Sequence, residues 1–261
     1  MLANSKNHFE GADHVVIDHV DADAHVGTEK KITNDESSQS VIVNNDVNYG
    51  SAADLAYYSV PTGSIDCLKT LGYKTVFLVG LRLYDQTFNS EVVSAVRDAY
   101  NARLGVEIYM LPEPRKDGVQ QLNTMIQGLT DNGILVRTVW IKITNFYYSW
   151  PTDTFEIGLT VGIYTNSADW DKITNNWSAG SDVLLWYYNY SGSGSSNASP
   201  ANFNDFVAFG GFKTPLVKQY SYWVSQCNVG NNQNVYAIGI SAKKSTFVAP
   251  EGKIVVGGIG L

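Results

Sequence analysis

The chain has 261 residues, of which 44% are hydrophobic and 16% charged, and this balance is typical of a globular protein with a substantial core. Its net charge of −7 at pH 7 argues against a nucleic-acid-binding surface, which needs clustered basic residues. No apolar run approaches the roughly 20 residues that a membrane-spanning helix requires, so we expect no membrane span.

Residues 1–50 are predicted to form an extended acidic arm. This segment holds nine acidic and three basic residues, all four histidines and only two aromatic residues. Polar and apolar residues alternate from His19 to Val26, which puts two histidines and two aspartates on one face of a predicted strand. A second strand would have to complete a metal site, so we interpret this face as solvated and expect no metal or cofactor.

Residues 51–240 are predicted to form a barrel in which strands and helices alternate. The expected strands are residues 53–59, 75–80, 106–110, 136–144, 159–164, 183–188, 216–220 and 235–240. The expected helices are residues 64–71, 91–104 and 119–130. Short apolar runs such as residues 75–80 are typical of parallel strands buried on both faces. The order therefore predicts a parallel sheet that closes, wholly or partly, into an α/β barrel.

Residues 241–261 are predicted to form a tail that ends in a strand-like apolar run, residues 253–261. Strands that lie outside a barrel can add to the sheet edge of another subunit. We therefore expect the chain to contact copies of itself through residues 1–50 and 250–261.

Two cysteines and three sequons bear on the compartment. Cys67 and Cys227 could form a single disulfide, and they lack the spacing of a metal site. Asn176, Asn189 and Asn197 each begin an Asn-x-Ser sequon, which permits glycosylation in a secreted protein, although Pro200 disfavours the third.

Six segments carry a family resemblance. They read DCLKTLGY at 66–73, LRLY at 81–84, AYNARLGV at 99–106, VGIYT at 161–165, LLWY at 184–187 and FGGFKTPLVKQY at 209–220. Their order and spacing resemble the Chalaropsis-type lysozymes, the family-25 glycoside hydrolases, and particularly their animal branch. The resemblance implies an irregular β/α barrel that cleaves bacterial cell-wall glycan. It also implies a Cys67–Cys227 disulfide and therefore an extracellular or secretory-pathway location.

The family's acidic positions are altered in this chain. The resemblance implies an Asp-x-Glu pair at the end of a central strand, but the Asp position holds Lys142 and the position of the catalytic Glu holds Thr144. A gapless alignment puts the first-strand aspartate on Leu55 and a later aspartate on Asn232. A hydroxyl and an ammonium cannot replace a proton donor and an anion, so we expect a pseudoenzyme without catalytic residues.

Three functions are compatible with these observations. We favour a structural subunit that assembles into a filament or extracellular matrix through its terminal arms. The first alternative is a protein that binds peptidoglycan or chitin without cleaving it. Its candidate contacts are Trp140, Tyr147, Tyr148, Trp186, Tyr187 and Tyr220, although core packing is the favoured interpretation of Trp140 and Trp186. The second alternative is an active hydrolase that uses relocated carboxylates, Glu113 and Asp85.

Overall fold

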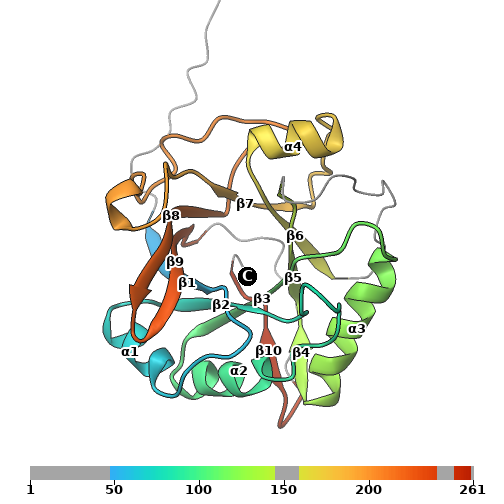
Figure 1. Cartoon of the computed structure of the whole chain (residues 1–261), viewed down its shortest axis with the longest axis vertical. Helices are drawn as coiled ribbons and strands as arrows, with labels where there is room; N and C mark the ends of the chain where they lie inside the picture. The colour runs from blue at the N-terminus through green and yellow to red at the C-terminus, as the bar shows by residue number, and fades with distance from the viewer. Residues whose placement is uncertain (1–47, 145–158, 240–249, 260–261) are drawn as a thin grey trace, which may run out of the picture. The chain divides into compact units, whose positions relative to one another are not determined.

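Eight strands form a closed barrel in the computed structural model, which describes residues 48–144, 159–239 and 250–259 (Figure 1). Around the barrel lie β1 (Tyr49–Leu55), β2 (Thr75–Val79), β3 (Gly105–Met110), β5 (Thr138–Lys142), β6 (Thr160–Thr165), β7 (Leu184–Tyr188), β8 (Val217–Gln226) and β9 (Val229–Ala237). Neighbouring strands are parallel from β1 to β8. The predicted α/β barrel is confirmed.

The last barrel strand corrects the expectation of a wholly parallel sheet. β9 begins at Val229 rather than near residue 235, and it runs antiparallel to both β8 and β1. Only Cys227 and Asn228 connect it to β8, and both have left-handed backbone angles, with φ of 56° and 60°. A two-residue turn of this kind makes a hairpin, whereas a parallel connection needs a much longer crossover.

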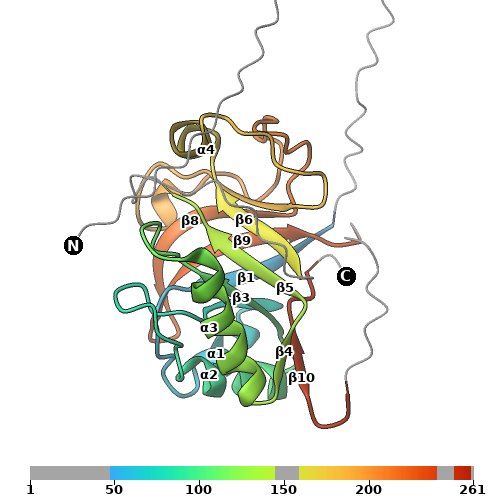
Figure 2. The same cartoon turned by 90° about the vertical axis from the view of Figure 1, so that its right-hand side faces the viewer.

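Four α-helices surround the barrel in the described part of the chain: α1 (Ser64–Thr70), α2 (Val92–Asn101), α3 (Gly118–Asp131) and α4 (Ser167–Thr174). The first three match the predicted helices within a few residues and lie along one side of the barrel, whereas α4 lies near β6 and β7 (Figures 1 and 2). The side chain of Asn166 caps α4 by accepting a hydrogen bond from the backbone N–H of Asp169. None of the described helices is long and apolar enough to cross a membrane.

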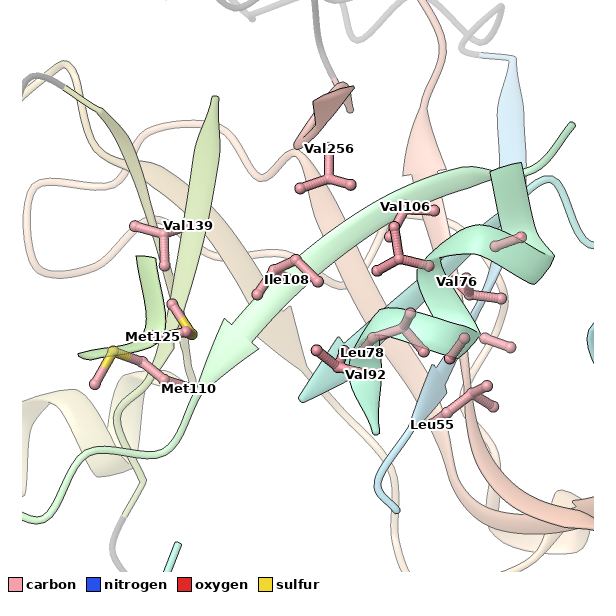
Figure 3. Close-up of a cluster of buried hydrophobic side chains, with 14 of the residues drawn as sticks. Leu55, Val76, Leu78, Val92, Val106, Ile108, Met110, Met125, Val139 and Val256 are labelled. Carbon is pink, nitrogen blue, oxygen red and sulfur yellow. The ribbon is translucent and has the colours of Figure 1, made fainter. Parts of the chain in front are cut away.

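Alternation along the strands divides the buried side chains into two clusters. The outer cluster, between strands and helices, includes Leu55, Val76 and Leu78 (Figure 3). The inner cluster fills the barrel and includes Phe77, Tyr109, Trp140, Tyr164 and Trp186. The barrel interior is therefore packed with aromatic rings, and Gly162 is needed because a Cβ there would lie 2.2 Å from the Trp140 ring.

The tail strand β10 (Ile254–Val256) pairs in parallel with β4 (Ile134–Val136), outside the barrel. The tail strand therefore pairs within its own chain, and contact of residues 250–261 with other copies of the chain stays a prediction. Residues 44–261 cluster as one compact unit, so the tail belongs to the barrel unit. β1 begins at Tyr49, inside the range expected for the arm, and residues 1–47 lie outside the described residues.

A disulfide joins Cys67 in α1 to Cys227 in the β8–β9 turn, which confirms the expected pairing. The bond closes a loop of 160 residues. The hydroxyl of Ser64, at the start of α1, also donates a hydrogen bond to the Cys227 carbonyl at 2.8 Å. The first helix is thereby attached to the hairpin that closes the barrel.

Candidate functional site

A buried ion pair lies at the carboxyl end of the barrel. Asp54 on β1 is completely buried, and its Oδ2 lies 2.6 Å from the Nζ of Lys142 on β5. Asn232 on β9 is the register partner of Asp54 and donates a hydrogen bond from Nδ2 to the same oxygen at 2.8 Å. One carboxylate oxygen is thus held by a cation and an amide.

Aromatic rings surround the ammonium of Lys142. Its Nζ lies 4.0 Å from the ring centre of Tyr109 and 4.7 Å from those of Tyr164 and Trp186. Burial lowers the pKa of Lys142, while the neighbouring Asp54 charge acts in the opposite direction. Burial, together with the Asp54 charge, also raises the pKa of the Tyr109 hydroxyl, which keeps it neutral. The Asp54–Lys142 pair is therefore enclosed by neutral rings.

The gapless alignment places Leu55 at the position of the family's first-strand aspartate, which implies that the barrel interior lacks a carboxylate at the end of β1. The structure corrects this implication. Leu55 belongs to the outer cluster, beside Val76 and Leu78 (Figure 3). Asp54 points into the barrel, where it meets Lys142. Successive side chains of a strand face opposite sides, so an offset of one residue exchanges interior for exterior. A carboxylate is therefore present inside the barrel at the end of β1.

Two of the altered family positions contact this carboxylate directly. Lys142 forms the ion pair, and Asn232 uses both ends of its amide: Nδ2 donates to Asp54, and Oδ1 accepts the backbone N–H of Trp223 at 3.0 Å. An aspartate at position 232 could not donate to Asp54 and would repel it. Thr144 follows β5 and is half-buried. The side chains at positions 142 and 232 thus both bind the Asp54 carboxylate.

The alternative carboxylates, Glu113 and Asp85, have local partners instead. Glu113 accepts from Nε of Arg115 at 2.8 Å, and this pairing lowers the pKa of its carboxyl. Asp85 accepts from the backbone and hydroxyl of Thr87, and these hydrogen bonds lower its pKa as well. A general acid needs a raised pKa, so neither environment favours proton donation near neutral pH.

Six aromatic residues, which we call the aromatic row, lead from the ion pair to the surface. Their order is Tyr164, Tyr188, Tyr190, Tyr222, Trp223 and Tyr57. The centroids of successive rings lie 5.0, 5.6, 5.4, 6.2 and 5.5 Å apart. The rings of Tyr190 and Tyr222 are stacked, with an angle of 13° between their planes.

Exposure increases along the aromatic row. Tyr164 is 5% exposed, whereas Tyr57, Tyr222 and Trp223 are 39–44% exposed. Trp223 lies within β8 and has a left-handed φ of 55°, in a stretch where the pairing with β9 is irregular. A non-glycine residue held in this conformation is uncommon and often marks a functional position.

Most of the aromatic residues proposed from the sequence lie elsewhere. Trp140 and Trp186 are completely buried, which confirms the favoured interpretation of core packing, and Tyr187 is 5% exposed, which corrects its assignment as a candidate glycan contact. Alternation turns the two tryptophans into the inner cluster and Tyr187 into the outer cluster. Tyr220 is half-buried, and Tyr147 and Tyr148 lie outside the described residues.

The aromatic row was not identified from the sequence, because the sequence signals for its residues are weak. Tyr188 and Tyr190 are two residues apart at the end of a predicted strand, which would have indicated a shared face. Tyr222 and Trp223 lie beyond the predicted end of β8, so no periodicity identified them. Among the described residues, no group of three or more His, Cys, Asp or Glu side chains is arranged to hold a metal ion.

The three sequons differ in their surroundings. Asn176 is exposed in a turn after α4. The amide of Asn189 donates to Asp205 at 2.6 Å, and that of Asn197 donates to the Ser193 carbonyl at 2.7 Å. The side-chain nitrogens at the second and third sequons are therefore occupied in the folded chain.

The closed eight-stranded barrel with its surrounding helices is a lysozyme-type fold, and comparisons with known proteins agree. The catalytic domain of an endolysin from a bacteriophage of Listeria monocytogenes superposes with a TM-score of 0.51 over 73% of this chain and 94% of that domain, at 11% identity. This similarity shows the fold alone.

The sequence comparisons identify the family. A family model described as lysozyme-like protein 1 matches residues 45–157 and 152–220. Lysozyme-like protein 1 of Caenorhabditis elegans is 42% identical over 247 residues, which cover 84% of this chain and 82% of the relative. A probable family-25 lysozyme of Dictyostelium discoideum is 30% identical over 191 residues, covering 66% and 84%. The chain belongs to the lysozyme-like protein 1 family, among the relatives of the family-25 lysozymes.

Proposed function

We propose that this protein is secreted and binds cell-wall-type glycan at the carboxyl end of its barrel without hydrolysing it. The disulfide supports an oxidising compartment. The relatives named as lysozymes support a polysaccharide of amino sugars as the ligand class. The altered acidic positions and the aromatic row support binding without cleavage.

The observation that carries this proposal is the direct contact of Asp54 with Lys142 and Asn232. Glycoside hydrolysis generally uses two carboxyl groups, one to protonate the leaving oxygen and one to act as nucleophile or base. Asp54 is completely buried and engaged by an ammonium 2.6 Å away, so its negative charge is already compensated. An ammonium beside the reacting carbon would also oppose the positive charge of the transition state. This geometry supports the absence of hydrolysis.

The aromatic row supplies the binding surface in this proposal. Sugar rings present apolar C–H faces, and tyrosine and tryptophan combine a flat apolar ring with a polar group that can hydrogen-bond. Tyr57, Tyr222 and Trp223 expose such faces on the strand ends and hairpin that flank the ion pair. An extended saccharide could stack on these rings without reaching the buried Asp54.

Binding can be tested by calorimetry against chitin oligomers and soluble peptidoglycan fragments. We expect Trp223→Ala to weaken binding about tenfold or more, because one stacking ring is lost. Trp177→Ala is the matched control, since Trp177 is 52% exposed but lies outside the aromatic row. Wild-type protein that binds neither ligand, or equal weakening by the two substitutions, would contradict the proposed surface.

Absence of hydrolysis is tested separately by the turbidity of a bacterial cell-wall suspension. We expect no clearing by the wild-type protein above that of buffer. Clearing that disappears in Asp54→Asn, Glu113→Gln or Asp85→Asn would instead establish an active enzyme. The three variants distinguish a catalytic role of the interior carboxylate from one of the two relocated carboxylates.

A further inference from the structure

A second buried acid lies inside the barrel, beside the C-terminal tail. Glu107 on β3 is 1% exposed and points into the barrel near the amino ends of the parallel strands. Its Oε2 accepts the indole N–H of Trp140 at 2.8 Å. Its Oε1 accepts the backbone N–H groups of Gly258 and Ile259 at 2.6 and 2.7 Å. The carboxylate therefore connects the aromatic interior to the C-terminal tail.

The tail is built to reach this carboxylate. β10 pairs with β4, and the next residue, Gly257, donates its N–H to the Val106 carbonyl at 2.8 Å. Gly257 has a φ of 86°, and a Cβ there would lie 2.4 Å from the backbone nitrogen of Thr138. Only glycine fits this turn, which directs Ile259 into the inner cluster, where it is 5% exposed.

A cavity of about 320 Å³ lies beside the contact between tail and barrel. Glu107, Gly258 and Ile259 line it together with Thr75 and Tyr236. Movement of the tail away from Glu107 would open this cavity and admit water to the carboxylate.

We propose that residues 257–259 form a pH-sensitive latch, in which Glu107 holds the tail across the amino end of the barrel in acid and releases it as the pH rises. The latch lies beside the amino ends of β2 and β3, where Thr75 and Gly105 line the cavity, and it does not rest on the proposed glycan binding.

The direction follows from the burial of Glu107. Burial under the tail raises the pKa of Glu107 from 4.5 to about 7, even though the three N–H donors act to lower it. A released tail would hydrate the carboxyl and return its pKa toward the ordinary value. Between pH 4.5 and about pH 7, the latched form consequently binds more protons than the released form. Latching therefore weakens as the pH rises through this interval.

Few other titratable groups line this contact. Besides Glu107, the titratable residues that line the cavity are Tyr100 and Tyr236, and no Lys, Arg, His or Asp of the described residues lines it. Within the described part of the chain, burial and N–H donors act on the Glu107 pKa, and no charged neighbour does. The nearest charged side chains of the tail, Glu251 and Lys253, precede β10.

Hydrogen exchange of the Gly258 and Ile259 amides in the full chain, expressed as protection factors by NMR, tests the latch. For pKa values of 4.5 and about 7 in the released and latched forms, we expect protection to fall about 70-fold between pH 5 and pH 8. The Trp140 indole N–H resonance should shift with a midpoint near pH 7. Protection that changes less than about threefold, or an indole signal that does not titrate there, overturns the proposal.

Two substitutions assign the effect to Glu107. Glu107→Gln removes the ionisable group and mimics the protonated carboxyl of the latched form, with its amide oxygen still able to accept the Gly258 and Ile259 N–H groups, so we expect a protected tail whose protection no longer depends on pH. Glu251→Gln changes an exposed acid of the same tail and should keep the wild-type dependence. A Glu107→Gln protein that retains the wild-type pH slope overturns the latch. If that variant does not fold, the wild-type Trp140 titration still decides.

Discussion

At the residue scale, the environment of Asp54 shows why the altered acidic positions belong together. A buried carboxylate is costly unless it is paired and hydrogen-bonded. Lys142 supplies the charge, and Asn232 supplies an amide that bridges Asp54 to the backbone of Trp223. The residues that replace the acids expected at these two positions therefore stabilise the acid that remains.

Removal of Lys142 should expose this dependence. We expect Lys142→Met to destabilise the protein by about 3–5 kcal/mol, because Asp54 would be left buried without a counter-charge. The double variant Asp54→Asn/Lys142→Met should recover much of that loss. Urea unfolding of the wild type, both single variants and the double variant completes the cycle. A single Lys142→Met loss below about 1 kcal/mol would show that Asp54 does not need the ammonium.

At the element scale, the β8–β9 hairpin combines three tasks. It closes the barrel by pairing with both β7 and β1, it carries Tyr222 and Trp223, and its turn holds Cys227. The disulfide to α1 and the hydrogen bond from Ser64 fix this turn from outside the barrel. The exposed end of the aromatic row thus rests on a covalently anchored element.

Loss of the disulfide should therefore affect both stability and the hairpin. We expect Cys67→Ser/Cys227→Ser to lower the free energy of unfolding by about 2–5 kcal/mol, since the unfolded chain would regain the freedom of a long loop. Urea titration of this double variant and of the oxidised wild type measures the difference. A change below about 1 kcal/mol would mean that barrel packing alone holds the hairpin.

At the scale of the whole molecule, self-association through the arm stays a prediction from the sequence. Residues 1–47 lie outside the described residues, and the tail strand pairs within its own chain. The contribution of the arm can be tested by truncation, and β1 shows where to truncate it. Removal of residues 1–50 would delete the start of a barrel strand, whereas removal of residues 1–43 leaves the compact unit complete.

Light scattering after size-exclusion chromatography can decide this prediction. We expect the full chain to form species larger than a monomer and the chain lacking residues 1–43 to be monomeric, because the acidic arm would supply the contact. A full chain that is monomeric, like the truncated chain, would rule out assembly through the arm. Association of both would place the contact on the barrel unit.

The alternation of apolar runs with helical patterns was sufficient to predict the α/β barrel and three of its helices. Such patterns are local, because burial of a strand or helix face imposes its own period on the residues. The disulfide pairing also followed from the sequence, through family resemblance. The antiparallel β9 was missed because its direction depends on the turn at residues 227–228, where neither residue is glycine.

By itself the sequence determined the composition and the succession of strands and helices, and the family resemblance led us to expect altered acidic positions at residues 142, 144 and 232. The tertiary structure alone decided which side of a strand Asp54 faces, which rings form the aromatic row, and that Glu107 meets the tail. These contacts join residues far apart in the chain, 88 positions apart for Asp54 and Lys142 and 152 for Glu107 and Ile259. No local period encodes such distant pairs, since barrel closure sets their geometry.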